Sequence, residues 1–281
     1  MNVIALANQK GGVGKTTTTI NLGSALAERG YRVLLVDVDP QFNCTMGLGV
    51  DPTGKPTLHE VLLKAAPLAD TLVPAGRGLT LAPSSLELAA AELQIPQMVA
   101  GERLLTEALE TVRDRFDFTL LDCPPSLGRL TLNALTAADG VIVPIQAGKW
   151  ALSGTQQLFD VVGLVRQRLN KELQVLGLLL TLVDTRTLLA REIVAHVRET
   201  HGDRVFRTVI KTASKLAEAA VADSDILSYA RSSDAAKAYR QLGDEVLERL
   251  GLSTAGADGE ETVPLTTASA PEPLPSQRGA A

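Results

Sequence analysis

The chain of 281 residues contains few aromatic residues, few histidines and almost no cysteine. Aromatic side chains make up only 3% of it and hydrophobic residues 45%, so its core must be built mainly from aliphatic side chains. The two cysteines, Cys44 and Cys123, show neither metal-binding spacing nor a disulfide framework, and the three histidines form no ligand cluster. These absences argue against a disulfide-stapled domain and a Cys/His metal protein, and they favour a reducing cytoplasm.

Long hydrophobic runs are also missing, because charged residues interrupt each apolar stretch, so no membrane span is expected. The first residues enter a strand-like segment at once, so we expect no signal peptide. The net charge of −5 is unevenly distributed: residues 253–281 hold four acidic residues and one basic residue, whereas residues 186–215 hold seven basic and three acidic residues. This basic segment is compatible with reversible binding to a phosphate backbone, and a solvated helix face is an equally weighted alternative.

Apolar strand-like runs alternate with helical patterns through the first 250 residues. This alternation predicts a single α/β domain over residues 1–252, with a doubly wound, mostly parallel sheet covered by helices on both faces. We expect strands at 3–7, 32–38, 79–82, 118–121, 140–145, 175–183 and 205–210. We expect helices at 16–29, 57–64, 102–115, 127–137, 151–169, 190–201 and 234–250, the second of them starting with a Thr57-x-x-Glu60 capping box. Residues 253–281, rich in Gly, Ala, Thr and Pro, are predicted to be disordered.

The stretch from Gln9 to Thr17, QKGGVGKTT, holds a relaxed form of the phosphate-binding loop between a strand-like run and a helical pattern. Backbone N–H groups of such a loop bind phosphate oxygens, and its glycines allow tight turning and close approach. We predict that Lys15 reaches the β- and γ-phosphates of ATP and that the Thr16 hydroxyl ligates Mg²⁺. A chance glycine-rich turn is the alternative. The predicted nucleotide-binding residues are Lys10, Gly11, Gly12, Val13, Gly14, Lys15, Thr16 and Thr17.

Two other strand-like runs end in carboxylates. In LLVDVDPQ, strand alternation places Asp37 and Asp39 on the same side, near the carboxyl end of a parallel strand, where ligands of such sheets bind. In FTLLDCPPS, Asp122 is the natural Walker B residue, holding Mg²⁺ through water. A solvated strand end is the alternative for the first pair. We interpret Cys123 as a small packing residue.

Together these motifs resemble the deviant-Walker P-loop ATPases, and within them the ParA/Soj branch of bacterial DNA-partitioning ATPases. The resemblance is carried by KGGVGKTT, VDVDPQ, DCPPS and VPIQ, the last at residues 143–146. It implies that Lys10 reaches the partner's phosphates in a nucleotide-sandwich homodimer, although a solvated lysine is the alternative. It also implies that Asp39 positions or activates the attacking water and that Asp37 supports Mg²⁺ through its hydration shell. The expected catalytic residues are Lys10, Lys15 and Asp39, and the expected metal-site residues are Thr16, Asp37 and Asp122.

The resemblance extends to a DNA-binding segment. DTRTLL at residues 184–189 is similar to the family's D-x-R-T-x-L, which implies that Arg186 helps to bind DNA non-specifically. A second basic position falls at Lys215, in a run that lies near adenine in relatives. This run departs from the family pattern, because Lys211-Thr212-Ala213 replaces Pro-Arg-Asn, and Gly148 stands where relatives commonly have glutamate.

The function implied is that of a cytoplasmic, nucleoid-associated ATPase with ATP and Mg²⁺ as cofactors and weak intrinsic turnover. Its homodimer would bind non-specific DNA, and a ParB-like centromere-binding protein would stimulate hydrolysis and release. A cargo-positioning relative and a small-metabolite enzyme with the same fold, like dethiobiotin synthetase, are open alternatives. A MinD-like membrane-cycling ATPase needs a basic amphipathic C-terminal helix, whereas residues 253–281 are acidic and Pro-rich. An iron–sulfur carrier would need a Cys-x-x-Cys motif, which the sequence lacks.

Overall fold

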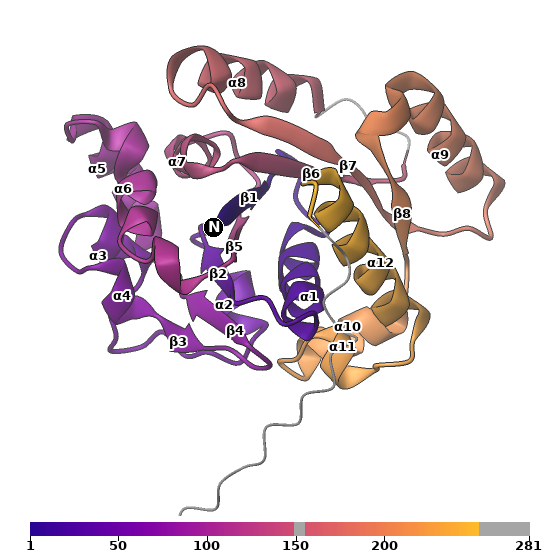
Figure 1. The fold of residues 1–281 in the computed structure, drawn as a ribbon, viewed down its shortest axis with the longest axis horizontal. Helices are drawn as coiled ribbons and strands as arrows, with labels where there is room; N and C mark the ends of the chain where they lie inside the picture. The colour runs from indigo at the N-terminus through magenta and orange to yellow at the C-terminus, as the bar shows by residue number, and fades with distance from the viewer. Residues whose placement is uncertain (149–154, 253–281) are drawn as a thin grey trace, which may run out of the picture.

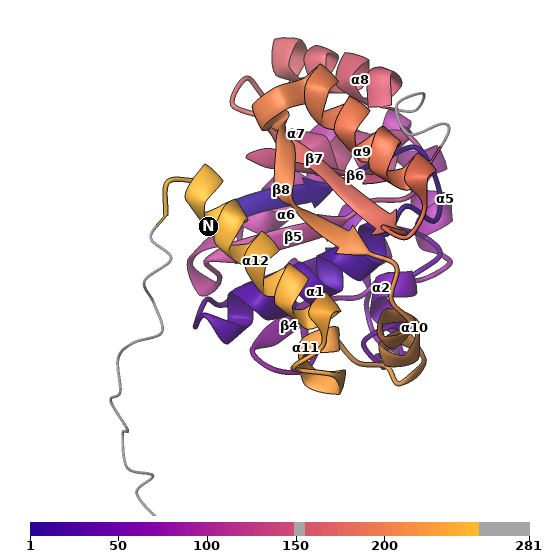
Figure 2. The same ribbon diagram turned by 90° about the vertical axis from the view of Figure 1, so that its right-hand side faces the viewer.

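The computed structural model describes residues 1–148 and 155–252, and it contains one eight-stranded sheet (Figures 1 and 2). The strand order is β3-β4-β2-β5-β1-β6-β7-β8, and every neighbouring pair is parallel except β3 with β4. The strands are β1 (Asn2–Leu6), β2 (Val33–Asp37), β3 (Val73–Pro74), β4 (Leu79–Ala82), β5 (Phe118–Asp122), β6 (Gly140–Gln146), β7 (Gln174–Val183) and β8 (Val205–Lys211).

Helices cover both faces of this sheet, as Figure 2 shows for α7 and α8 on one side and α1 and α12 on the other. One face carries α1 (Lys15–Glu28), α2 (Asn43–Met46), α10 (Ser214–Val221), α11 (Ile226–Tyr229) and α12 (Asp234–Arg249). The other carries α3 (Leu58–Leu62), α4 (Leu68–Thr71), α5 (Leu88–Gln94), α6 (Leu104–Glu110), α7 (Arg129–Ala137), α8 (Thr155–Arg168) and α9 (Leu188–His201).

The apolar strands explain why two layers of helices are needed. Along β1, Val3 and Ala5 face one hydrophobic cluster, whereas Ile4 and Leu6 face the other. Because side chains alternate across a strand, a strand without polar positions can be buried only between two covering layers. The predicted doubly wound, mostly parallel sheet is therefore confirmed.

All seven predicted strands are present, with ends shifted by one residue at most. The two-residue antiparallel strand β3 was missed because it is too short to show a period. The predicted helix 102–115 is wrong in extent: α6 is flanked by 3-10 turns at Gly101–Arg103 and Arg113–Arg115. The helices α2, α4, α5, α10 and α11 were not predicted. The first part of predicted helix 151–169 and the predicted disordered tail 253–281 lie outside the described residues.

The Thr57–Glu60 capping box is confirmed at the start of α3. The Thr57 backbone N–H donates to Glu60 Oε2 at 2.7 Å, and the Thr57 hydroxyl accepts a bond from the His59 backbone at 3.3 Å. In the part of the chain that the structure describes, no helix combines the length and hydrophobicity that a membrane crossing needs.

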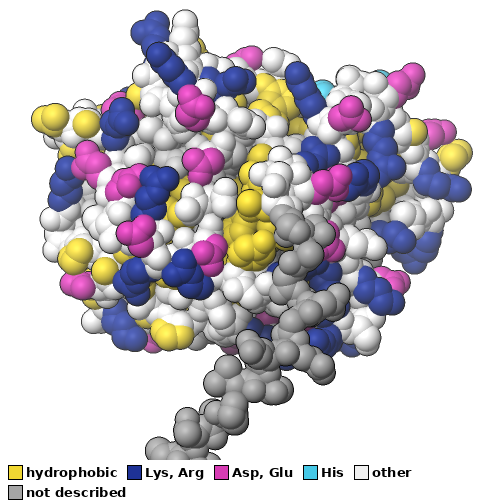
Figure 3. Space-filling model, in the orientation of Figure 1, with side chains coloured by type: hydrophobic (Ala, Val, Ile, Leu, Met, Phe, Trp, Pro, Cys, Tyr) yellow, Lys and Arg dark blue, Asp and Glu magenta, His cyan; other side chains and the backbone are white. Residues whose placement is uncertain are grey.

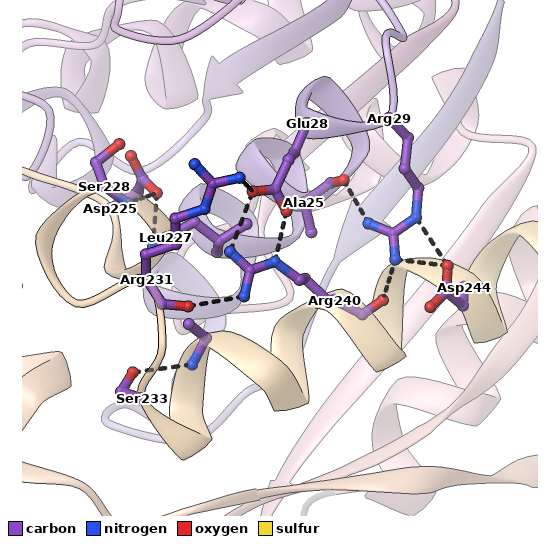
Figure 4. Close-up of polar contacts among 11 residues, drawn as sticks. Ala25, Glu28, Arg29, Asp225, Leu227, Ser228, Arg231, Ser233, Arg240 and Asp244 are labelled. Atoms are coloured by element: carbon purple, nitrogen blue, oxygen red, sulfur yellow. Dashed lines mark hydrogen bonds and ion pairs between the residues drawn. The ribbon is translucent and has the colours of Figure 1, made fainter. Parts of the chain in front are cut away.

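The phosphate-loop helix α1 is tied to α12, the last helix in the described part of the chain, by a set of arginine contacts (Figure 4). Arg29 Nε donates to Asp244 at 2.7 Å, and Arg29 also donates to the carbonyl of Ala25 at 2.7 Å. One turn away, Arg240 donates to both carboxylate oxygens of Glu28. These contacts hold the far end of α1, so its N-terminus is presented on a fixed support.

Candidate nucleotide-binding site

The phosphate-binding loop connects the end of β1 to the N-terminus of α1. Gly12 and Gly14 have φ values of 72° and 84°, a left-handed conformation that glycine adopts without steric cost. The loop therefore turns back over the start of α1, where the helix dipole and unpaired N–H groups favour an anion. Of the eight predicted nucleotide-binding residues, the structure places Gly11, Gly12, Gly14, Lys15, Thr16 and Thr17 along one cavity, whereas Lys10 and Val13 do not line it.

Three polar contacts hold the loop, and the sequence reasoning missed the residues that make them. The Asn8 side chain is buried; its amide donates to the Pro144 carbonyl at 2.6 Å and its oxygen accepts from the Lys10 backbone at 3.0 Å. Thr181, at the end of β7, donates to the Val13 carbonyl at 2.8 Å. A buried asparagine directly after a strand was the available signal, because a buried polar group needs partners.

Lys15 is 7% exposed, and its ammonium donates to the carbonyl of Lys10 at 3.2 Å. Burial lowers its pKa, and the nearby carboxylate of Asp122 opposes that shift. An ammonium that is already desolvated and pointed back over the loop is well suited to a phosphate, since its interaction with an anion is weakly screened there.

Thr16 and Asp122 meet where α1 approaches the end of β5. The Thr16 hydroxyl donates to Asp122 Oδ2 at 2.7 Å, and the Thr19 hydroxyl lies 3.3 Å from Oδ1. Burial raises the pKa of Asp122, a buried carboxylate for which a cation would be the natural partner. A hydroxyl and a carboxylate are oxygen donors of the kind Mg²⁺ prefers, so these residues fit the ion.

Asp37 and Asp39 lie in different environments, although strand alternation predicted one side for both. Strand β2 ends at Asp37, so the pleat does not extend to Asp39. Asp39 is 7% exposed and lines the cavity, and its Oδ1 accepts from the Gln41 backbone at 2.9 Å. Asp37 is fully buried and does not line the cavity; burial raises its pKa. Its carboxylate is directed at Thr45.

The cavity beside the loop has a volume of about 610 Å³, within the range of small-molecule sites. Besides the loop and Asp39, its wall includes residues from α2, which the sequence did not indicate, and from α10, the run with Lys215 for which the family resemblance implied a place near adenine. At its edge Leu182 has a φ of 52°, an unusual conformation for a bulky residue and one that clusters at functional sites. The additional wall residues include Met46, Leu216, Ala219, Ala220 and Asp223.

Several chromosome-partitioning proteins are similar to this chain over most of its length. A family profile described as an AAA domain matches residues 1–175. The chromosome-partitioning ATPase Soj of Thermus thermophilus is 47% identical over 248 residues, which cover 88% of this chain and 96% of that protein. The sporulation initiation inhibitor protein Soj of Bacillus subtilis is 42% identical over 246 residues, with 87% and 97% covered. The chromosome partitioning protein ParA of Caulobacter vibrioides is 42% identical over 253 residues, with 89% and 95% covered.

The chain belongs to the ParA/Soj family of P-loop ATPases. Solved structures agree on the fold. A Mycobacterium smegmatis protein described as cobyrinic acid a,c-diamide synthase, with bound ATP analogue and magnesium, is 40% identical with a TM-score of 0.79, covering 89% of this chain and 96% of that one. The cell division ATPase MinD of Pyrococcus furiosus is 28% identical with a TM-score of 0.72, covering 88% and 98%.

The two residues that the family resemblance assigns to DNA lie outside the nucleotide cavity. Arg186 follows β7, its side chain is 88% exposed, and its guanidinium contacts both oxygens of Asp184 at 2.8 Å. Lys215, in the first turn of α10, donates to Glu218 at 2.6 Å. Figure 3 shows Lys and Arg side chains interspersed with Asp and Glu, with several on the side where α9 and β8 lie. This face is charged and solvated, and both residues already have acidic partners.

The two cysteines are buried, as expected for packing residues. Cys44 lies in α2 and Cys123 follows β5, and both thiols are free. Burial raises the pKa of the Cys44 and Cys123 thiols, which disfavours the reactive thiolate. Neither cysteine is therefore a candidate nucleophile.

Proposed function

We propose that this chain is a DNA-partitioning ATPase that binds ATP with Mg²⁺, dimerises, and in that state binds DNA non-specifically. The arrangement that supports the proposal most directly is the contact between Thr16 and Asp122 beside buried Lys15, in a chain 42–47% identical to Soj and ParA proteins. Lys15 would hold the β- and γ-phosphates. Thr16 and Asp122 would hold Mg²⁺, which supplies charge neutralisation at the phosphates when bound.

The proposed catalytic residue for hydrolysis is Asp39. Its carboxylate lies in the cavity wall with Lys15 and the loop, where it can orient a water toward a bound γ-phosphate. Among the described residues, no arginine lines this cavity, so the subunit by itself supplies little charge stabilisation to the transition state. Weak intrinsic turnover follows, and we propose that a ParB-like partner bound to a centromere-like site raises it.

Lys10 would join the two subunits, by reaching the phosphates held in the partner. The exposed face with Arg186 and Lys215 would then contact the DNA backbone. Because phosphate contacts carry no sequence information, binding would be indifferent to sequence. The protein would accordingly be a cytoplasmic one associated with the nucleoid, and hydrolysis would release it from DNA.

Two alternatives use the same motifs. One alternative is a small-metabolite enzyme, because a 40%-identical structure is described as a cobyrinic acid a,c-diamide synthase. The other is a cargo-positioning ATPase, which would differ only in its partner. A MinD-like membrane cycle is less well supported, since α12 buries its apolar face, including Tyr239, Leu242 and Val246, against the rest of the domain. Residues 253–281 lie outside the described part of the chain.

The test is fluorescence anisotropy with two DNA duplexes of unrelated sequence, in the presence of ATP, ADP or no nucleotide. We expect binding to both duplexes with equal affinity in ATP, and much weaker binding in ADP or without nucleotide. Equal affinity with ATP and ADP, or no DNA binding at all, would contradict partitioning. The second outcome would favour the metabolite enzyme.

A further inference from the structure

The Asp37 side chain accepts its hydrogen bonds from the protein itself. The side chain is fully buried at the end of β2, in register with Asp122 of β5. Its Oδ2 accepts two bonds of 2.8 Å from Thr45, one from the backbone N–H and one from the hydroxyl, and its Oδ1 accepts from the Asp39 backbone at 3.2 Å. All three donors belong to the segment that follows the strand.

Thr45 continues the contact to another part of the sheet. Its hydroxyl donates to Asp37 and accepts from the Ser84 backbone N–H at 3.0 Å, just beyond the end of β4. Thr45 and Ser84 are both fully buried. A buried hydroxyl that is both donor and acceptor has its orientation fixed from two sides, so Thr45 joins the ends of β2 and β4 through α2.

The segment Asp39–Met46 depends on such anchors because its own structure is weak. Helix α2 has only four residues, and its N-cap, Phe42, has a φ of 43°, which is strained for a residue with a side chain. Yet both ends of this segment, Asp39 and Met46, line the nucleotide cavity. A short helix beside a strained residue needs tertiary contacts to hold one position.

We propose that Asp37 is a positioning residue: it fixes the segment Asp39–Met46 through Thr45, and it does not act on Mg²⁺ through the ion's hydration shell. The inference rests on the proposed function, because Asp39 is the group whose placement matters for hydrolysis. Both oxygens of this buried side chain accept hydrogen bonds from the segment, and a buried donor that loses its acceptor costs free energy. Weakening these hydrogen bonds would let Asp39 shift relative to a bound nucleotide.

The test compares Asp37→Asn, Thr45→Val, the double variant and Thr45→Ser, with ATP hydrolysis measured across ATP and Mg²⁺ concentrations. We expect Asp37→Asn and Thr45→Val each to lower kcat by about ten- to a hundredfold, the cost of a catalytic group misplaced by about 1 Å. The KM for ATP and the half-saturating Mg²⁺ concentration should stay within about twofold of the wild-type values. The kcat of the double variant should be no lower than that of the more impaired single variant. Thr45→Ser keeps the hydroxyl and should behave like the wild type.

Thr16→Ala serves as the comparison for a true metal ligand, and it should raise the half-saturating Mg²⁺. If Asp37 acted through the hydration shell, Asp37→Asn would also raise it, by about tenfold or more, while Thr45→Val would not. That pattern, or losses that multiply in the double variant, would overturn the proposal.

Amide hydrogen exchange in the nucleotide-free protein separates this inference from the proposed function. The backbone N–H groups of Thr45 and Ser84 donate into the contact, so both should exchange faster in Asp37→Asn and in Thr45→Val, with distant core amides unchanged. If the wild type hydrolyses no ATP, the proposed function fails, and faster exchange still supports the anchor. Unchanged exchange at both amides would overturn it.

Discussion

The charged residues at the nucleotide edge of the sheet and the two basic residues proposed to contact DNA lie in opposite environments. At the nucleotide edge Lys15, Asp37 and Asp122 are buried, and each is held by hydrogen bonds: Lys15 to the loop, Asp122 to Thr16 across 106 residues, and Asp37 to Thr45 in the segment after its strand. Arg186 and Lys215 are instead solvated and paired with acids two or three residues away.

The difference shows that the fold holds the charged groups of the nucleotide site in fixed positions, whereas it leaves the exposed basic residues at the solvated surface. Burying charged groups is costly unless partners compensate, so their convergence at one edge indicates a site built for a charged ligand. Solvated ion pairs contribute little free energy and occur on most proteins, so they indicate a binding surface only when a ligand is shown to bind them. We therefore expect large effects from substitutions at the nucleotide edge and graded effects from substitutions at the exposed basic residues.

The largest effect is expected from Lys15→Ala, which removes the buried ammonium. Because charge-assisted hydrogen bonds to phosphate are strong and only weakly screened here, nucleotide affinity should fall at least about a hundredfold. Isothermal titration with ATP measures this directly. Lys171→Ala, at an exposed lysine beyond α8, is the matched control and should bind as the wild type does.

Asp39→Ala should separate binding from turnover. The carboxylate lines the cavity without holding the loop, so ATP binding and ATP-dependent DNA binding should persist while kcat falls about a hundredfold or more. A steady-state phosphate-release assay and a DNA-binding assay on one sample would show both. Asp51→Ala, at an exposed acid, controls for loss of charge, and wild-type turnover in the Asp39 variant would remove Asp39 from the mechanism.

Arg186→Ala and Lys215→Ala should weaken DNA binding moderately and equally on all sequences. Each lost phosphate contact should make the slope of log affinity against log salt shallower by about 0.9. Nucleotide binding should be unaffected, since neither residue lines the cavity. Arg113→Ala provides the matched control, being an exposed arginine paired with nearby Glu110. An Arg186 variant that binds DNA like wild type would exclude this residue from the interface.

The smallest effect should come from removing the acidic partner of Arg186. Asp184→Asn removes the carboxylate that accepts from Nε and one terminal nitrogen of the Arg186 guanidinium, and that guanidinium holds the pKa of Asp184 at about 2. An exposed pair competes only weakly with DNA, so affinity should rise by less than about fivefold, most clearly at low salt. A decrease in affinity would mean that Asp184 orients Arg186 for DNA instead of competing for it.

Much of the nucleotide edge could be predicted from the sequence because its signals are local. The glycines of the loop, Lys15 and Thr16 are contiguous, and Asp122 ends a recognisable apolar strand. The fold class followed from the same alternation of strands and helices. Strand periodicity was misleading for Asp37 and Asp39, which are two positions apart. Strand β2 ends at Asp37, so the alternation of sides does not continue to Asp39.

The missed features depend on contacts between distant segments. Thr45 reaches Ser84 across 39 residues, and Asn8 reaches Pro144 across 136. Neither pairing leaves a local pattern. The α10 wall was implied by the family resemblance alone and left no local pattern: Leu216 and Ala219 line the cavity because α10 lies beside the loop and α1. Sequence periodicity identifies a buried face without identifying what it packs against.

The central claim is that the nucleotide site controls assembly, and Lys10→Ala tests it most directly. Lys10 begins the loop, so its loss should spare ATP affinity while removing the contact to a second subunit. The measurement is size-exclusion chromatography with light scattering, with and without ATP. We predict that the wild type doubles from its 29.7 kDa monomer mass in ATP, whereas Lys10→Ala binds ATP and stays at the monomer mass. A Lys10→Ala protein that doubles its mass with ATP as the wild type does would contradict the account.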